Sequence, residues 1–257
     1  MTFGKVYNII FLLMKKLLTI VLCKHTGEGL TAPKEDIELL FADESQANDS
    51  PKALYELIKQ AKGKYTVIAD TDLTFAQTEE FTGVAEECNT DILAFDGGYA
   101  LKTSVLKGVP SKLYSDRYGA EIYAAFDSKT ITAVALKPFN FTVQHAQYCE
   151  EDKQILTETL EEFKKSKAKL PKPVYTFIFD ILCARLETFY ICAMIALFRK
   201  EIYAEELVEF DRKLKENIVL YLALEKRFTL AKLAKLREKN FKISFLQYNK
   251  FRKKVKK

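Results

Sequence analysis

The first half of the chain alternates short apolar runs with stretches of helical periodicity. Such runs are typical of buried strands, and helices between them would cover both faces of a parallel sheet. The predicted strands are Leu17–Leu22, Ile37–Phe41, Tyr65–Ala69 and Asp91–Phe95. The pattern therefore predicts an α/β fold with a mainly parallel sheet flanked by helices.

Two helices are predicted between these strands. Ser50-Pro51 opens the first, because proline is favoured at the first helical position, and Gly63 stands where a C-cap glycine would end it. The second runs from about Gln77 to Cys88. Farther along, Ile122–Phe126 and Ile131–Leu136 could add strands at the far side of the sheet.

The pattern changes to helix from about residue 150. The acids Glu150 to Asp152 suit the first turn of a helix, and apolar residues recur at helical spacing after them. Further amphipathic helices are expected over Leu207–Phe228 and Leu230–Phe245. The chain is thus expected to divide into an α/β domain over residues 1–149 and a basic, all-helical region over residues 150–257.

The longest apolar stretch, Val174–Phe198, has the composition of a membrane segment only in part. Asp180, Arg185 and Glu187 interrupt it near its middle, where charges are expensive in lipid. We therefore expect a packed helix, or one lying at an interface, rather than a helix that spans a membrane.

Charge is distributed unevenly along the chain. The formal net charge is +5, but residues 199–257 hold 18 Lys and Arg against 8 Asp and Glu. A basic end on a mildly acidic body suggests an anionic partner, either a membrane surface or a nucleic acid, although a solvated helix face would look the same. The aromatics Phe241, Phe245, Tyr248 and Phe251 accompany the lysines at spacings of three or four, which suits a helix face better than an RNA-binding module. Together with the positive charge, Phe241, Phe245 and Phe251 predict association with a membrane surface.

Cysteine and histidine usage narrows the classes of site. The five cysteines are scattered without a Cys-x-x-Cys pair, which argues against a zinc knuckle or a disulfide framework and for the reducing cytosol. Two histidines exclude a histidine-rich metal site. A cytoplasmic protein is expected, peripheral on the inner face of the cell membrane if the basic end binds lipid.

The segment richest in chemistry is Asp70-Thr71-Asp72, which follows the strand ending at Ala69. Positions i and i+2 of an extended segment point the same way, so both carboxylates can reach one ion. Carboxylate oxygens suit a hard cation such as Mg²⁺ or Mn²⁺, which can bridge a diphosphate. Asp-x-Asp alone is also a common turn sequence.

The surrounding residues resemble the nucleotide-sugar half of the family 2 glycosyltransferases, which have the GT-A fold. The similarity extends over about Ile37 to Tyr99 and includes an acidic turn that begins at Asp43. The positions in register with the family pattern are Ala53, Ala61, Gly63, Tyr65, Asp70 and Asp72.

The resemblance implies transfer of a sugar from a nucleotide-diphosphate donor to a cell-surface polysaccharide or a lipid-linked acceptor. Asp70 and Asp72 would hold the divalent cation, and Asp43 together with Asp70 would bind the nucleotide sugar. Sugar transfer with inversion also needs a carboxylate base. Asp152, in Glu151-Asp152, is the best match to the family's acidic pair, and Glu121 and Asp96 are its rivals.

Two positions depart from the family pattern. Leu54 and Tyr55 stand where the family has an arginine and an asparagine near the donor diphosphate. Losing an arginine there removes a strong charge-assisted contact. The alternatives are therefore a catalytically degenerate relative, acting as a binding or assembly module, and a nucleic-acid-associated protein that uses the basic end.

Overall fold

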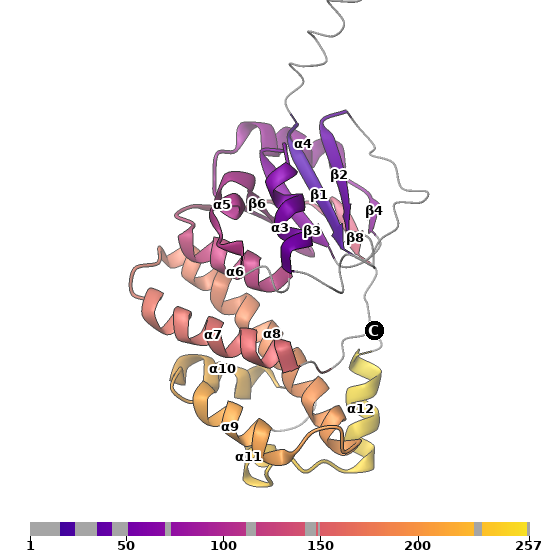
Figure 1. The fold of residues 1–257 in the computed structure, drawn as a ribbon, viewed down its shortest axis with the longest axis vertical. Helices are drawn as coiled ribbons and strands as arrows, with labels where there is room; N and C mark the ends of the chain where they lie inside the picture. Colours follow the sequence, from indigo (N-terminus) through magenta and orange to yellow (C-terminus); the bar gives the residue numbers. More distant parts are fainter. Residues whose placement is uncertain are drawn as a thin grey trace, which may run out of the picture. The chain divides into compact units, whose positions relative to one another are not determined.

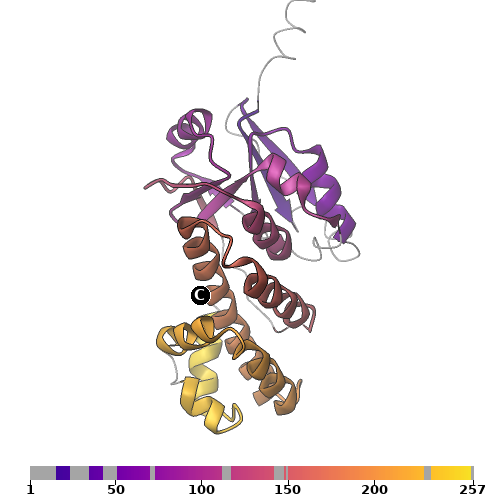
Figure 2. The same ribbon diagram turned by 90° about the vertical axis from the view of Figure 1, so that its left-hand side faces the viewer.

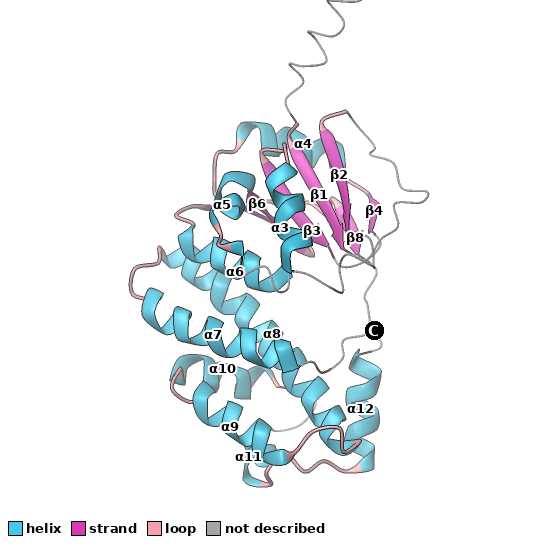
Figure 3. Ribbon diagram, viewed as in Figure 1, coloured by secondary structure: helices cyan, strands magenta, loops and turns pink. Residues whose placement is uncertain are grey.

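The computed structural model describes residues 16–23, 35–42, 51–69, 73–111, 117–141, 148, 150–228 and 233–255. The chain forms two compact units, Met1–Thr142 (unit 1) and Val143–Lys257 (unit 2). Among the described residues, unit 1 contains all the strands, and unit 2 is helical (Figures 1 and 3).

Unit 1 is built on a mixed sheet. Within the described residues the strand order is β2 (Ile37–Ala42), β1 (Leu18–Cys23), β3 (Tyr65–Ala69), β6 (Gly98–Lys102), β5 (Ile92–Phe95) and β7 (Ile131–Ala133). β1 pairs in parallel with β2 and β3, and β5 with β7, whereas β6 is antiparallel to both of its neighbours. The four predicted strands therefore run in one direction in one sheet, as expected. The reversed strand β6 was not predicted.

Helices cover both faces of this sheet. They are α3 (Pro51–Gln60), α4 (Thr78–Glu87), α5 (Thr103–Gly108) and α6 (Arg117–Asp127). Alternate residues of β3 divide between the faces: Val67 joins the core cluster with Phe81 of α4, while Thr66 hydrogen-bonds Thr103 of α5 at 2.8 Å. All five residues of β3 are buried, which explains its continuous apolar run. A separate two-stranded ladder joins β4 (Leu73–Phe75) to β8 (Phe139–Phe141).

The predicted strand Ile122–Phe126 is wrong, because these residues lie inside α6. The run is buried on almost every side, and a short, fully buried run cannot be assigned to helix or strand by its periodicity. The second predicted strand, Ile131–Leu136, forms only over its first three residues, as β7. The predicted helix Gln77–Cys88 is confirmed as α4.

Unit 2 is organised around one long helix. Its helices are α7 (Glu150–Ser166), α8 (Lys172–Phe198), α9 (Ala204–Leu214), α10 (Ile218–Arg227), α11 (Leu233–Glu238) and α12 (Phe245–Val255). Figures 1 and 2 show α8 as the longest of them, and it packs against α7, α10 and α12. In the described part of the chain, α8 alone has the length and hydropathy to cross a membrane. Because 61% of its most apolar window is buried in protein, the structure favours the packed helix over the interfacial one, the two alternatives that the sequence left open.

The last two predicted helices are broken in the structure. Leu207–Phe228 divides into α9 and α10 at buried Asn217, whose side-chain amide donates to the Leu160 carbonyl at 3.4 Å. In the segment Leu230–Phe245, α11 ends before Asn240 and Phe241, both at positive φ, and α12 begins only at Phe245. The sequence has no glycine or proline at either break, so neither break could be predicted from it.

Candidate functional site

The carboxyl ends of three neighbouring strands lie at one edge of the unit 1 sheet. Leu22 of β1 pairs with Phe41 of β2 on one side and with Ala69 of β3 on the other. Because strands are spaced by about 4.8 Å, the ends of β2 and β3 lie roughly 10 Å apart across β1. This edge is where ligands of open α/β sheets bind.

The predicted nucleotide and metal residues follow these strand ends directly. Asp43 comes one residue after β2, and Asp70 one residue after β3. Asp43, Asp70 and Asp72 themselves lie outside the described residues. Among the residues that are described, no three His, Cys, Asp or Glu side chains gather as a metal site. The strands β2 and β3 end at one edge of the sheet, and the three aspartates follow these strands in the sequence.

The turn between β5 and β6 reaches the same edge. Phe95, the last residue of β5, pairs with Gly98, the first of β6, which leaves Asp96 and Gly97 as the turn. Gly97 has φ 90°, a conformation that glycine adopts without strain. Asp96, one rival for the base, is exposed, and its N–H donates to the Leu136 carbonyl at 2.8 Å.

Glu121, the other rival, is a buried carboxylate close to this turn. It lies on α6 with 4% of its surface exposed. Tyr99, the second residue of β6, donates its hydroxyl to Glu121 Oε2 at 2.6 Å. The short distance is typical of a hydroxyl bonded to a carboxylate. Because the sequence pattern assigns the residues just after Glu121 to a strand, the position of Glu121 on a helix was missed.

Asp152 belongs to unit 2 and lies in the first turn of α7. Burial, with a smaller contribution from the Asp152 charge, raises the pKa of the Cys192 thiol on α8 to about 11. The charge of Asp152 is therefore close enough to α8 to act on the Cys192 thiol. The structure thus places Asp152 and Glu121 in different units.

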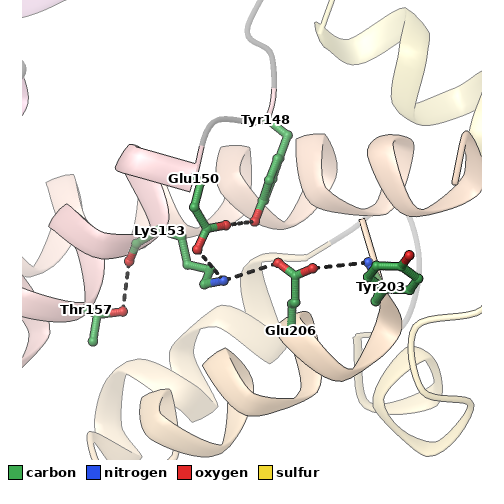
Figure 4. A network of polar contacts seen from close by, with 6 residues as sticks. All are labelled: Tyr148, Glu150, Lys153, Thr157, Tyr203 and Glu206. Carbon is green, nitrogen blue, oxygen red and sulfur yellow. Dashed lines mark hydrogen bonds and ion pairs between the residues drawn. The ribbon is translucent and has the colours of Figure 1, made fainter. Parts of the chain in front are cut away.

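Neighbouring Glu150 is held in a polar network that joins α7 to α9 (Figure 4). It accepts from Tyr148 Oη at 2.7 Å and pairs with Lys153 at 2.6 Å, and Lys153 reaches Glu206 at 3.3 Å. Burial lowers the pKa of Lys153, but its bonds to the two carboxylates outweigh burial and leave that pKa raised. Glu150 therefore serves as a contact at the start of α7, in a network that reaches α9.

Several positions that carry the family resemblance have clear structural roles. Gly63 does not cap α3, which ends at Gln60; its N–H donates to Thr19 Oγ1 at 2.8 Å. A Cβ on Gly63 would lie 2.4 Å from the Thr19 nitrogen, so only glycine fits against β1. Tyr65 is fully buried and donates to the Thr90 carbonyl at 2.9 Å.

Leu54 and Tyr55, which depart from the family pattern, both lie on α3. Leu54 is buried on α3, and the Lys59 ammonium lies 5.0 Å from the ring centroid of Tyr55. Leu54 is thus a packing residue of unit 1.

The aromatics predicted to meet a membrane divide into two groups. Phe241 and Phe251 are buried inside unit 2, so that part of the prediction is wrong, whereas Phe245 is exposed. Phe251 packs on Phe228, with ring centroids 6.1 Å apart, and Phe241 stacks on Tyr190 at 5.8 Å. Phe241 lies outside α11 and α12, at positive φ, and helical spacing does not say whether core or solvent covers a side chain.

No protein-family model matches the sequence, and no curated protein matches it.

Proposed function

We propose that unit 1 binds a nucleotide-diphosphate sugar, as the donor half of a GT-A-fold, family 2 glycosyltransferase-like protein. Asp70 and Asp72 hold Mg²⁺ or Mn²⁺, and Asp43 contacts the nucleoside. The observation that supports this proposal is the common edge at which β2 and β3 end, directly before Asp43 and Asp70. The strand ends are roughly 10 Å apart, a separation suited to a nucleoside at one and a diphosphate at the other.

Carboxylates two residues apart after a strand are a suitable donor set for a hard divalent cation. When bound, the cation neutralises the diphosphate and stabilises it as a leaving group. The protein's own part is to orient the donor along the sheet edge and to accept a proton. The sugar acceptor is a cell-surface polysaccharide or a lipid-linked molecule.

For an inverting transfer we place the base at Glu121. The acceptor hydroxyl attacks the anomeric carbon, the bond to the diphosphate oxygen breaks, and the hydroxyl proton passes to the carboxylate. Glu121 is favoured over Asp152 because it belongs to the unit that carries the strand edge and because Tyr99 fixes its carboxylate. The Tyr99 hydroxyl thus orients the Glu121 carboxylate through Oε2.

Degeneracy is the alternative that a specific observation favours. The family's diphosphate-contacting arginine corresponds here to buried Leu54. A charge-assisted hydrogen bond contributes about 1.5–3 kcal/mol, so its loss would weaken donor binding roughly ten- to a hundredfold. Weak donor binding with slow or undetectable transfer is the expected outcome with common donors.

Calorimetric titration with UDP-, GDP- and CDP-sugars, each with and without Mn²⁺, tests the proposal. Heat from one nucleotide class that appears only with the cation is the expected result. The absence of binding heat with all three nucleotide classes would contradict donor binding. Cation-dependent binding together with rapid turnover would instead refute the degenerate alternative.

A further inference from the structure

Apolar and aromatic side chains gather where the end of α8 meets the start of α12. We call this cluster the aromatic tip; it consists of Phe198, Phe245, Leu246 and Tyr248. Leu246 is 73% exposed, Phe245 64% and Phe198 37%. Large side chains at such exposure, side by side, are typical of an interaction surface rather than of a core.

The tip is held in place by its own contacts. Phe198 and Tyr248 stack with ring centroids 4.4 Å apart, and Arg199 Nε donates to Tyr248 Oη at 3.3 Å. Below the tip, buried Phe251 and the Lys254–Glu187 ion pair fasten α12 within unit 2. The exposed apolar side chains are therefore presented by two packed helices.

The sequence that contains α12 is strongly basic. From Lys239 to Lys257 the sequence has eight Lys and Arg and no Asp or Glu. On α12, Leu246, Lys250 and Lys253 follow at spacings of four and three, so they lie on one face of the helix, and all three are exposed. Along this face the surface changes from apolar to cationic.

We propose that the aromatic tip docks on an anionic lipid bilayer. Phe245 and Leu246 enter the boundary between headgroups and acyl chains, while Lys250 and Lys253 meet the headgroup phosphates. A bilayer fits better than a protein partner, because lysine is depleted in protein interfaces but common beside membrane-inserted apolar side chains. This inference concerns unit 2 and does not rest on nucleotide binding by unit 1.

Flotation of the full-length chain with vesicles tests this docking surface. The protein should float with phosphatidylcholine vesicles that contain phosphatidylglycerol, stay behind with phosphatidylcholine alone, and be released from the anionic vesicles by salt. The double variant Phe245→Ser/Leu246→Ser should reduce partitioning at least about tenfold, because burial of a large apolar side chain drives insertion.

The matched control is Ile218→Ser/Val219→Ser, which removes a similarly exposed apolar pair from α10. It should leave partitioning unchanged, and circular dichroism should show that both variants are folded. The proposal is overturned if the native chain does not float with anionic vesicles, or if the tip variant floats as well as the native chain. An equal loss in the α10 control would overturn it too. Self-association abolished by the tip variant, without vesicle binding, would assign the tip to a second copy of the chain instead.

Discussion

Gly63 shows how a residue that carries the family resemblance is explained by packing. The chain passes so close to Leu18 and Thr19 of β1 that a side chain at this position would overlap the backbone. The sequence pattern places Gly63 at a helix end because glycine is common there. The true reason is a contact with a strand 44 residues earlier, which no local pattern reveals.

We expect Gly63→Ala to destabilise unit 1, because the Cβ would lie 2.4 Å from the Thr19 nitrogen and 2.6 Å from the Leu18 carbonyl carbon. Overpacking of this kind lowers the free energy of unfolding by about 1–3 kcal/mol. Urea denaturation measures the change.

Gly83→Ala is the control for the same substitution. Gly83 lies exposed within α4, and its Cβ would meet nothing within 4 Å. Alanine there should stabilise by about 0.5–1 kcal/mol, because it restricts the unfolded chain and favours helix. Equal effects at the two glycines would show that β1 does not approach Gly63 as described.

At the scale of whole elements, prediction succeeded where one local signal was strong. The strands β1, β2, β3 and β5 and the helix α4 are all marked by clear apolar periodicity or by flanking breakers. The strand β6 was missed because its sequence, Gly-Tyr-Ala-Leu-Lys, starts with glycine and ends with lysine and so has no continuous apolar run. Helix α6 was missed because its apolar run is buried on both sides.

The C-terminal end of α8 could not be predicted from the sequence, because no glycine stands there. Lys200 has φ 63°, and the bonds from Lys200 N to Leu197 O and from Glu201 N to Ala196 O form a Schellman motif. Glycine is the usual residue at this position, because other side chains are strained in the left-handed region.

We therefore expect Lys200→Gly to raise the free energy of unfolding by roughly 0.5–1 kcal/mol, which thermal or urea denaturation would detect. Lys213→Gly, at an exposed position within α9, should lower it by about 1 kcal/mol. If both substitutions destabilise equally, the left-handed conformation at Lys200 is wrong.

At the scale of the whole molecule, the candidate site residues belong to two different units. The sequence favours Asp152 as the base, because Glu151-Asp152 matches the acidic pair of the family pattern. The structure places Asp152 on α7 of unit 2 and Glu121 beside the strand edge of unit 1. Tertiary packing decides which side chains belong to the same unit. The sequence therefore gives both acids as candidates but cannot choose between them. Asp43, Asp70 and Asp72 stay predictions that rest on the strands leading into them.

The central claim is that this sheet edge binds a nucleoside diphosphate through a divalent cation held by Asp70 and Asp72. The most direct measurement is electron paramagnetic resonance of free Mn²⁺ during titration with the protein and a nucleoside diphosphate. Asp72→Ala should weaken nucleotide-dependent Mn²⁺ binding by about tenfold or more without lowering the melting temperature. Asp127→Ala, which removes an exposed aspartate at the end of α6, should bind as the native chain does. Native-level Mn²⁺ binding by Asp72→Ala would contradict the account.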